Sequence, residues 1–278
     1  MFKTLIASWS IRTKLVLATA IPILALSLFA SVFAYTQFQQ SQRMAETVRV
    51  SQFSSALSDL VHELQKERGR TAGFVASRGG SSQTAALETQ KPATDSALAS
   101  YRREAESAEK IFKTESQKEH LSLVNRLLSG LETHRSRVGT LELPVSDSVG
   151  GYTEMVDALI LLVHDELSLL NAVELSSDME AMIALMRAKE AAGLERAQGN
   201  AAFSASDMPT TRHITLLSLI SKQNSYFEQF RVAVGKDWQQ RLDSFMAGAA
   251  NEQVGDARNV LVESGYGGDL SAYSSGEW

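Results

Sequence analysis

The sequence contains no cysteine and only four prolines among its 278 residues. Without cysteine, a disulfide framework and a thiolate metal site are both excluded. The scarcity of proline, together with abundant Ala, Leu, Ser, Glu and Gln, favours helices over sheets. The chain is long enough for one or two domains with a hydrophobic core. We therefore expect an all-α protein.

Sequence motifs that would indicate an enzyme are also missing. The five histidines form no metal-binding motif, because His62-Glu63 is not followed by a second histidine at position 66. The sequence has no glycine-rich phosphate loop and no nucleophile elbow around a serine. We expect a protein that is not an enzyme and that has no cofactor and no metal site.

Charged residues are absent from the run LVLATAIPILALSLFASVFA, which extends over 20 residues from Leu15 to Ala34. At about 1.5 Å per residue, a helix of this length matches the ~30 Å hydrocarbon core of a bilayer. We predict a transmembrane helix over residues 15–36, in which Pro22 is tolerated. A cleaved signal peptide is the competing interpretation. The run is longer than the roughly 7 to 15 apolar residues usual in a signal peptide, which favours a retained anchor.

The N-terminal segment before this run carries Lys3, Arg12 and Lys14 and no acidic residue. By the positive-inside rule, residues 1–14 are expected in the cytoplasm and the chain after the span on the other side of the membrane. The net charge of −5 makes the remainder acidic, so nucleic acid is not an expected partner. Any anion site must therefore be built from a few local cations.

The stretch ELQKERGRTAGF, from Glu63 to Phe74, places an arginine among apolar residues. The positions that share one helical face are Leu57, Leu60, Val61, Leu64, Glu67, Arg68, Thr71, Ala72 and Val75. A buried guanidinium needs a partner, because an isolated buried charge costs several kcal/mol and arginine does not lose its proton. We expect an anionic group to meet Arg68.

A second Glu-Arg pair, Glu195-Arg196, lies in the stretch MRAKEAAGLERAQGNAAF. Helical spacing places Arg196 on a face with Met186, Gly193 and Phe203. Two interpretations follow from the pattern. Either both Glu-Arg pairs belong to buried ion-pair networks between helices, or the two arginines form an anion site.

Three segments carry a resemblance to a known family: LVHELQKERGRTAGFVASRG (60–79), ETQKPATDSAL (88–98) and AKEAAGLERAQGNAAFS (188–204). They resemble the nitrate- and nitrite-sensing (NIT) domain of bacterial receptors, and the resemblance extends from about Phe38 to the C-terminus. It implies an all-helical domain of two stacked antiparallel four-helix bundles that binds nitrate or nitrite through arginines. By position, Arg68 and Arg196 match best and Arg70 is a third candidate.

The chain departs from the family pattern at one point. The resemblance also implies how the whole chain is arranged. Gln90-Lys91 followed by Pro92 stands where the family tends to have Gln-Arg, which should affect the start of that helix. We expect residues 37–263 to form a periplasmic sensor domain of an inner-membrane receptor. Residues 264–278 should form a tail before a last helix, a second span and a cytoplasmic signalling module.

The receptor is expected to be a homodimer that passes a conformational signal across the membrane. The sequence leaves open whether the ligand is nitrate or nitrite and which output module follows. The alternative function is a structural helical module for dimerisation or partner docking, in which the inward arginines form ion pairs only.

The hydrophobic spacing predicts where the helices lie. They are expected at Gln37 to about Ser77, Ala85–Phe112, Glu115–Val138, Tyr152 to about Ala205, Thr210–Val234 and Asp237 to about Glu263. Pro92 should lie in the first turn of its helix or kink it, and a break is expected near Ser176–Asp178. Residues 139–151 are predicted to be a loop that separates the two halves of the domain.

Overall fold

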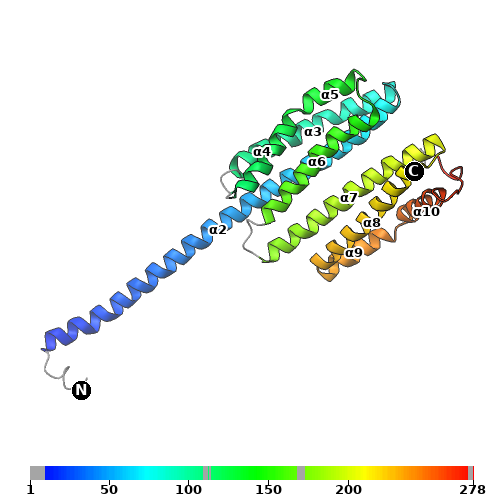
Figure 1. Cartoon of the computed structure of the whole chain (residues 1–278). Coiled ribbons are helices and arrows are strands. Elements are labelled where there is room, and N and C mark those ends of the chain that lie inside the picture. Colours follow the sequence, from blue (N-terminus) through cyan, green and yellow to red (C-terminus); the bar gives the residue numbers. More distant parts are fainter. Residues whose placement is uncertain (1–9, 109–111, 113, 168–172, 275–277) are drawn as a thin grey trace. The chain divides into compact units, whose positions relative to one another are not determined.

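The computed structural model describes residues 10–108, 112, 114–167, 173–274 and 278, and in these residues all regular secondary structure is helical. The chain divides into two compact units, Met1–Arg49 and Val50–Trp278. The helices are α2 (Ile11–Ala76), α3 (Ser81–Ala108), α4 (Glu115–Ser129), α5 (Leu131–Gly139), α6 (Val145–Leu167), α7 (Val173–Ala205), α8 (Thr210–Ala233), α9 (Lys236–Met246) and α10 (Ala249–Ser264) (Figure 1).

Among the described residues, the first unit is formed mainly by the N-terminal part of α2. Large apolar side chains are exposed along it, including Leu24, Leu28, Phe29 and Phe33. From Pro22 onward, α2 is the one helix in the described part of the chain that is long and apolar enough to cross a membrane. Lys3 lies outside the described residues, and Arg12 lies near the start of the helix.

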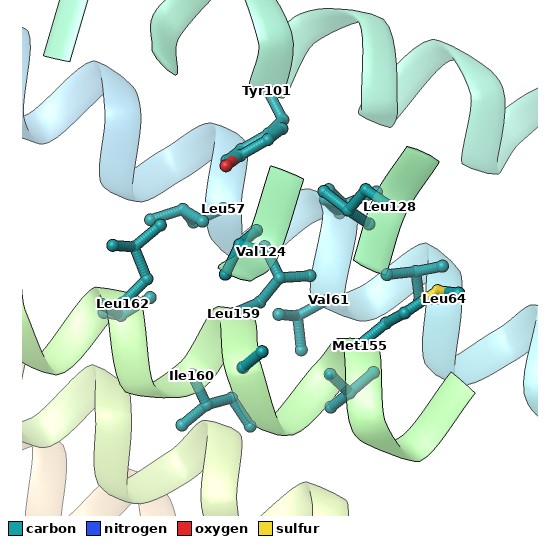
Figure 2. Close-up of a cluster of buried hydrophobic side chains, with 14 of the residues drawn as sticks. Leu57, Val61, Leu64, Tyr101, Val124, Leu128, Met155, Leu159, Ile160 and Leu162 are labelled. Atoms are coloured by element: carbon teal, nitrogen blue, oxygen red, sulfur yellow. The ribbon is translucent and has the colours of Figure 1, made fainter. Parts of the chain in front are cut away.

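The second unit is built around a core that α2, α3, α4 and α6 share. Figure 2 shows buried side chains from all four helices converging, among them Leu57 and Leu64 of α2, Tyr101 of α3, Val124 of α4 and Leu159 of α6. Burial of one such side chain contributes about 1.5 to 3 kcal/mol. This cluster fixes the face of α2 that carries Glu67 and Arg68.

The C-terminal helices of the second unit, α7 to α10, form further hydrophobic clusters that are separate from this core. Phe203 of α7, Leu216 of α8 and Leu261 of α10 belong to one cluster. Ala184 of α7, Phe230 of α8 and Leu242 of α9 belong to another. Because α7 contacts α6 as well as α8 and α10, it has neighbours on more than one face.

Several predicted helices are confirmed, while two others are each divided into two helices at or beside a glycine. The continuous helix through residues 37–76 and the helix at Thr210–Ala233 are confirmed. The predicted helix 115–138 is instead two helices, because the chain is interrupted at Gly130, where the backbone N–H bonds to the carbonyls of Leu127 and Leu128. The predicted helix 237–263 is likewise interrupted at Ala247 and Gly248.

The predicted loop at 139–151 is mostly wrong, since α6 begins at Val145. Gly151 lies within this helix for a packing reason: a Cβ atom there would lie 2.4 Å from Cε1 of His134. Pro92 lies in the interior of α3 rather than in its first turn. The break predicted near Ser176–Asp178 lies a few residues earlier, because α6 ends at Leu167 and α7 begins at Val173.

Candidate functional site

Glu67 of α2 is fully buried and is held by an arginine from another helix. Arg135 of α5 donates to both of its carboxylate oxygens, from Nε at 2.7 Å and from Nη2 at 2.8 Å. The Tyr152 hydroxyl donates to Oε1 at 2.8 Å. Although burial lowers the pKa of Arg135, its hydrogen bonds to Glu67 and Asp95 raise that pKa above its ordinary value. Glu67 is therefore fully engaged and cannot pair with Arg68.

Glu195 of α7 has an equivalent environment. Its side chain is 2% exposed, and Arg258 of α10 donates to it from Nε at 2.6 Å and from Nη2 at 2.8 Å. Gln223 of α8 also donates to this carboxylate. In both Glu-Arg pairs the glutamate thus turns inward and forms a two-pronged ion pair with an arginine from elsewhere in the chain.

Arg68 is buried, as the sequence predicts, and one edge of its guanidinium is occupied. Nη1 forms an ion pair with Glu190 of α7 and donates to Thr153 Oγ1 at 3.0 Å. Nη2 faces the backbone of α7, because a Cβ atom built on Gly193 would lie 3.1 Å from it. The anionic group expected at Arg68 is therefore Glu190 in this structure.

Arg196 differs from the prediction, because its side chain is exposed rather than placed in an inward apolar face. Since α7 has neighbours on more than one face, its buried positions do not form a single stripe, and Glu195 takes the inward direction. A Cβ atom on Gly69 of α2 would lie 3.5 Å from Nη2 of Arg196. No described residue forms an ion pair with this guanidinium.

The two arginines are thus reciprocal. Arg68 of α2 lies against Gly193 of α7, and Arg196 of α7 lies against Gly69 of α2. In each case the missing side chain lets a guanidinium approach the opposite helix closely. Both nitrogens Nη2 consequently lie in the space between α2 and α7.

Arg70, the third predicted site residue, is exposed and borders the same space. At three residues from Glu67 it could have formed a surface ion pair along the helix. Glu67 is instead buried against Arg135, so Arg70 has no carboxylate partner among the described residues. Its guanidinium is available to a ligand.

A cavity of about 1230 Å³ lies between α2 and α7 and brings the three predicted arginines together. Its charged lining residues, all cationic, are Lys66, Arg68, Arg70, Lys189 and Arg196. No Asp or Glu is present among the described residues that line it. In a chain with a net charge of −5, this cavity is a local concentration of positive charge.

Lys189 and His62 form a pair beside the cavity. Nζ of Lys189 contacts Nδ1 of His62. Burial, followed by the like charge of Lys189, lowers the pKa of His62 below its ordinary value of 6.5. Burial also lowers the pKa of Lys189, although the charges of Glu63 and Glu190 oppose this effect. An anion in the cavity would favour the charged form of both groups.

The cavity also contains polar groups without partners. Oε1 of Gln65 and Oδ1 of Asn200 are buried and accept no hydrogen bond from the described residues. Both side chains line the cavity. Nε1 of Trp278, another lining residue, donates to the carbonyl oxygen of Arg196 at 2.9 Å.

The sequence predicted the three arginines as site residues and did not predict Lys66, Lys189, Gln65 and Asn200 as such. Lys189 and Asn200 lie one to two turns either side of Gly193 and Arg196, so helical spacing places them on the same side of α7 as Arg196. Lys66 and Gln65 gave no such signal, because they lie off the apolar face of α2. Among the described residues, no cluster of His, Asp and Glu could hold a metal ion.

Comparison with known protein families decides the family of the chain. The family described as nitrate and nitrite sensing, NIT, matches residues 59–278. The chain belongs to the NIT family. The match contains Arg68, Arg70 and Arg196, and the NIT domain is a sensing domain rather than a catalytic one.

A solved structure of the NasR transcription antiterminator resembles the fold, with a TM-score of 0.75 and 21% sequence identity. The similarity covers 84% of this chain and 62% of that chain. At this identity the comparison supports the all-helical fold of the NIT protein. No curated protein sequence matches the chain.

Proposed function

We propose that the cavity between α2 and α7 binds nitrate or nitrite, with Arg68 and Arg196 as principal ligands and Arg70 as a third. The observation that carries this proposal is the cationic lining, which includes three arginines and no acidic residue among the described residues. The NIT family match supports the choice of anion.

The chemistry of the ligand fits this arrangement. Nitrate is planar, singly charged and weakly hydrated, and a guanidinium presents parallel N–H donors in one plane. Arg68 offers its Nη2 edge, because Nη1 is already engaged with Glu190 and Thr153. The exposed guanidinium of Arg196 offers its full donor set.

Binding would also produce a signal. In the empty cavity, five cations repel one another across the space between α2 and α7. An anion removes part of this repulsion and stabilises the arrangement in which the two helices are close. The ligand then has different affinities for two conformations, as signalling requires.

The second candidate function is a structural helical module in which these arginines serve packing alone. The Arg68–Glu190 ion pair favours it, while Arg196, which forms no ion pair with a described residue, favours the sensor. Isothermal titration of the detergent-solubilised chain distinguishes the two. The sensor binds nitrate or nitrite with measurable heat and gives none with chloride at equal ionic strength, whereas the structural module gives the same absence of heat with all three salts.

We further propose that the chain is part of a bacterial receptor of the inner membrane. Residues 1–14 would be cytoplasmic, 15–36 would form the span and 37–263 the periplasmic sensor domain, arranged as two stacked antiparallel four-helix bundles. The tail 264–278 would lead to a last helix, a second span and a cytoplasmic signalling module, and the receptor would act as a homodimer. The long apolar helix α2, which continues into the second unit, supports the anchor.

Reporter fusions test this topology. An alkaline phosphatase fused after Glu63 should be active, and a green fluorescent protein fused there should be dark, because the basic N-terminal segment stays in the cytoplasm. The opposite pair of results would place the sensor domain in the cytoplasm. N-terminal sequencing of the membrane fraction should find residues 1–34 retained, and cleavage near Ala34 would indicate a signal peptide.

A further inference from the structure

A fixed carboxylate stands directly behind the principal ligand arginine. Glu190 of α7 is buried, with a relative exposure of 6%. It forms an ion pair with Nη1 of Arg68 and accepts a hydrogen bond from Nε2 of Gln65 at 2.9 Å. Both of these partners line the cavity, while Glu190 itself does not. The cavity is therefore lined by cations but lies next to one anchored negative charge.

We propose that Glu190 is the residue that sets the charge selectivity of the cavity, so that it takes monovalent anions and rejects divalent ones. This inference rests on the proposed function of the cavity as an anion site. The cavity binds small monovalent oxyanions and excludes tetrahedral dianions. Sulfate is the probe for the excluded class.

Electrostatics explains why such a residue is needed. Five cations attract a dianion about twice as strongly as a monoanion at the same position, because the Coulomb energy is proportional to ligand charge. A purely cationic cavity would therefore favour sulfate or hydrogen phosphate. The repulsion from Glu190 also doubles for a dianion, so Glu190 lowers the net attraction of both anions in the same proportion, and it acts from the partly enclosed side, where screening by solvent is weakest. The cost of removing water from an ion rises with the square of its charge, so the remaining attraction offsets dehydration for a monoanion but not for a dianion.

The geometry at Arg68 strengthens this effect. Glu190 and Thr153 occupy Nη1, so an anion in the cavity meets only the remaining edge of the guanidinium. The charge of Arg68 is consequently offset in part by Glu190 before any ligand arrives. The net positive charge that Arg68 contributes to the cavity is smaller, which weakens the attraction of a dianion by twice as much as that of a monoanion.

Asp157 of α6 shares this electrostatic environment. Although the Asp157 side chain is exposed, local desolvation, followed by the like charge of Glu190, raises its pKa above the usual value, while Arg68, Lys222 and Arg187 oppose the shift. No described residue forms an ion pair with Asp157. Its carboxylate therefore adds a second negative charge that interacts with Arg68 and Glu190.

The experiment compares nitrate and sulfate binding to the detergent-solubilised full chain by isothermal titration at constant ionic strength. In the Glu190→Gln variant the charge is removed, the amide oxygen can still accept from Arg68, and the new NH2 group can donate to the unpaired Oε1 of Gln65 once the Gln65 amide turns over. We expect nitrate to bind about 3- to 10-fold more tightly than to the wild type. Sulfate should gain by about the square of that factor, roughly 10- to 100-fold, because its charge is twice as large.

Two further variants make the test independent of folding problems in Glu190→Gln. Asp157→Asn removes a carboxylate without an ion-pair partner and should change both affinities in the same direction and by the same square relation, but less. Glu180→Gln is the matched control on α7: Glu180 is exposed and lies ten residues, about 15 Å, from Glu190, beyond the Debye length of about 8 Å. It should change neither affinity.

The outcomes separate the inference from the proposed function. If nitrate gives no heat with the wild type, the anion function fails and the inference fails with it. If nitrate binds the wild type but Glu190→Gln strengthens sulfate no more than nitrate, only the inference is overturned. A loss of nitrate affinity in Glu190→Gln also overturns it, because Glu190 would then serve to position Arg68.

Discussion

The two Glu-Arg pairs of the chain begin from the same dipeptide and end in different electrostatic environments. Their glutamates are equivalent, since Glu67 and Glu195 are both buried and both held by an arginine from another helix. Their arginines are not, because Arg68 is buried and paired with Glu190, while Arg196 is exposed. The glutamates therefore stabilise the fold, and the arginines face the space between α2 and α7.

The two sides of the cavity therefore have different roles. The α2 side presents an arginine that the protein has already neutralised in part. The α7 side presents an arginine whose charge no described residue balances. A ligand should gain most of its affinity from Arg196 and most of its orientation from Arg68.

The largest expected effect concerns the inward glutamates. Arg135→Met leaves the fully buried Glu67 without its counter-charge and should lower the free energy of unfolding by about 3 to 5 kcal/mol. Arg258→Met should cost less, because the Arg258 side chain is 26% exposed and water can reach the carboxylate it leaves. Urea unfolding followed by circular dichroism measures both, and equal losses would contradict the difference in burial.

The next largest effect is the difference in stability between variants of the two arginines in the absence of ligand. Arg68→Ala leaves Glu190 buried without its cation and should destabilise the domain by about 3 kcal/mol. Arg196→Ala should change stability by no more than about 0.5 kcal/mol, because its side chain is exposed and forms no ion pair with a described residue. The double variant Arg68→Ala/Glu190→Gln should recover part of the loss, and thermal melts that show no recovery would mean that Glu190 is not the cause.

A smaller effect separates the two glycines. Replacing a glycine in a helix interior by alanine stabilises by roughly 0.5 to 1 kcal/mol when there is space. At Gly69 the new Cβ would lie at an ordinary 3.5 Å from Arg196, so Gly69→Ala should stabilise the empty domain. At Gly193 it would lie 3.1 Å from Arg68, which Glu190 holds in place, so the gain should be absent. Equal gains in melting temperature would show that Arg68 is free to move.

The smallest effect is the pH dependence at the edge of the cavity. The folded pKa of His62 is below its unfolded value of 6.5, so the unfolded chain takes up the proton first. This contribution to stability is complete above about pH 6.5 and is lost as the pH falls further. His62→Gln should flatten that part of the stability profile, while nitrate should weaken the pH dependence by favouring protonated His62. If the domain instead became more stable on acidification and His62→Gln removed this gain, the pKa shift of His62 would have the opposite sign.

The sequence correctly predicted the burial of Arg68 on the α2 side of the cavity, because on α2 a single apolar stripe marks the buried face. On α2, Leu57, Leu60, Val61 and Leu64 all pack into one core, so their spacing correctly placed Arg68 inside. On α7, the helix packs on several faces, and the same reasoning put Arg196 inward when Glu195 takes that place. Periodicity identifies a buried residue only where a helix has one buried face.

Other features depended on contacts that no local pattern contains. The pairing of Arg68 with Glu190 joins residues far apart in the chain, and so do the contacts of Lys189 with His62 and of Gln65 with Glu190. The interruption at Gly130 and the continuation of α6 through Gly151 show that glycine breaks one helix and permits close packing in another. At Gly151 the tertiary contact with His134 explains why glycine lies within a helix, despite the low helix propensity of glycine.

The most direct test of the account is nitrate titration of the wild type, Arg196→Ala and Arg196→Lys. We expect nitrate binding to be lost in Arg196→Ala and only weakened in Arg196→Lys, which keeps the charge but not the planar pair of donors. The melting temperatures of the three proteins without nitrate should agree closely. Full nitrate binding by Arg196→Ala would contradict the central claim that an anion is held between the arginines of α2 and α7.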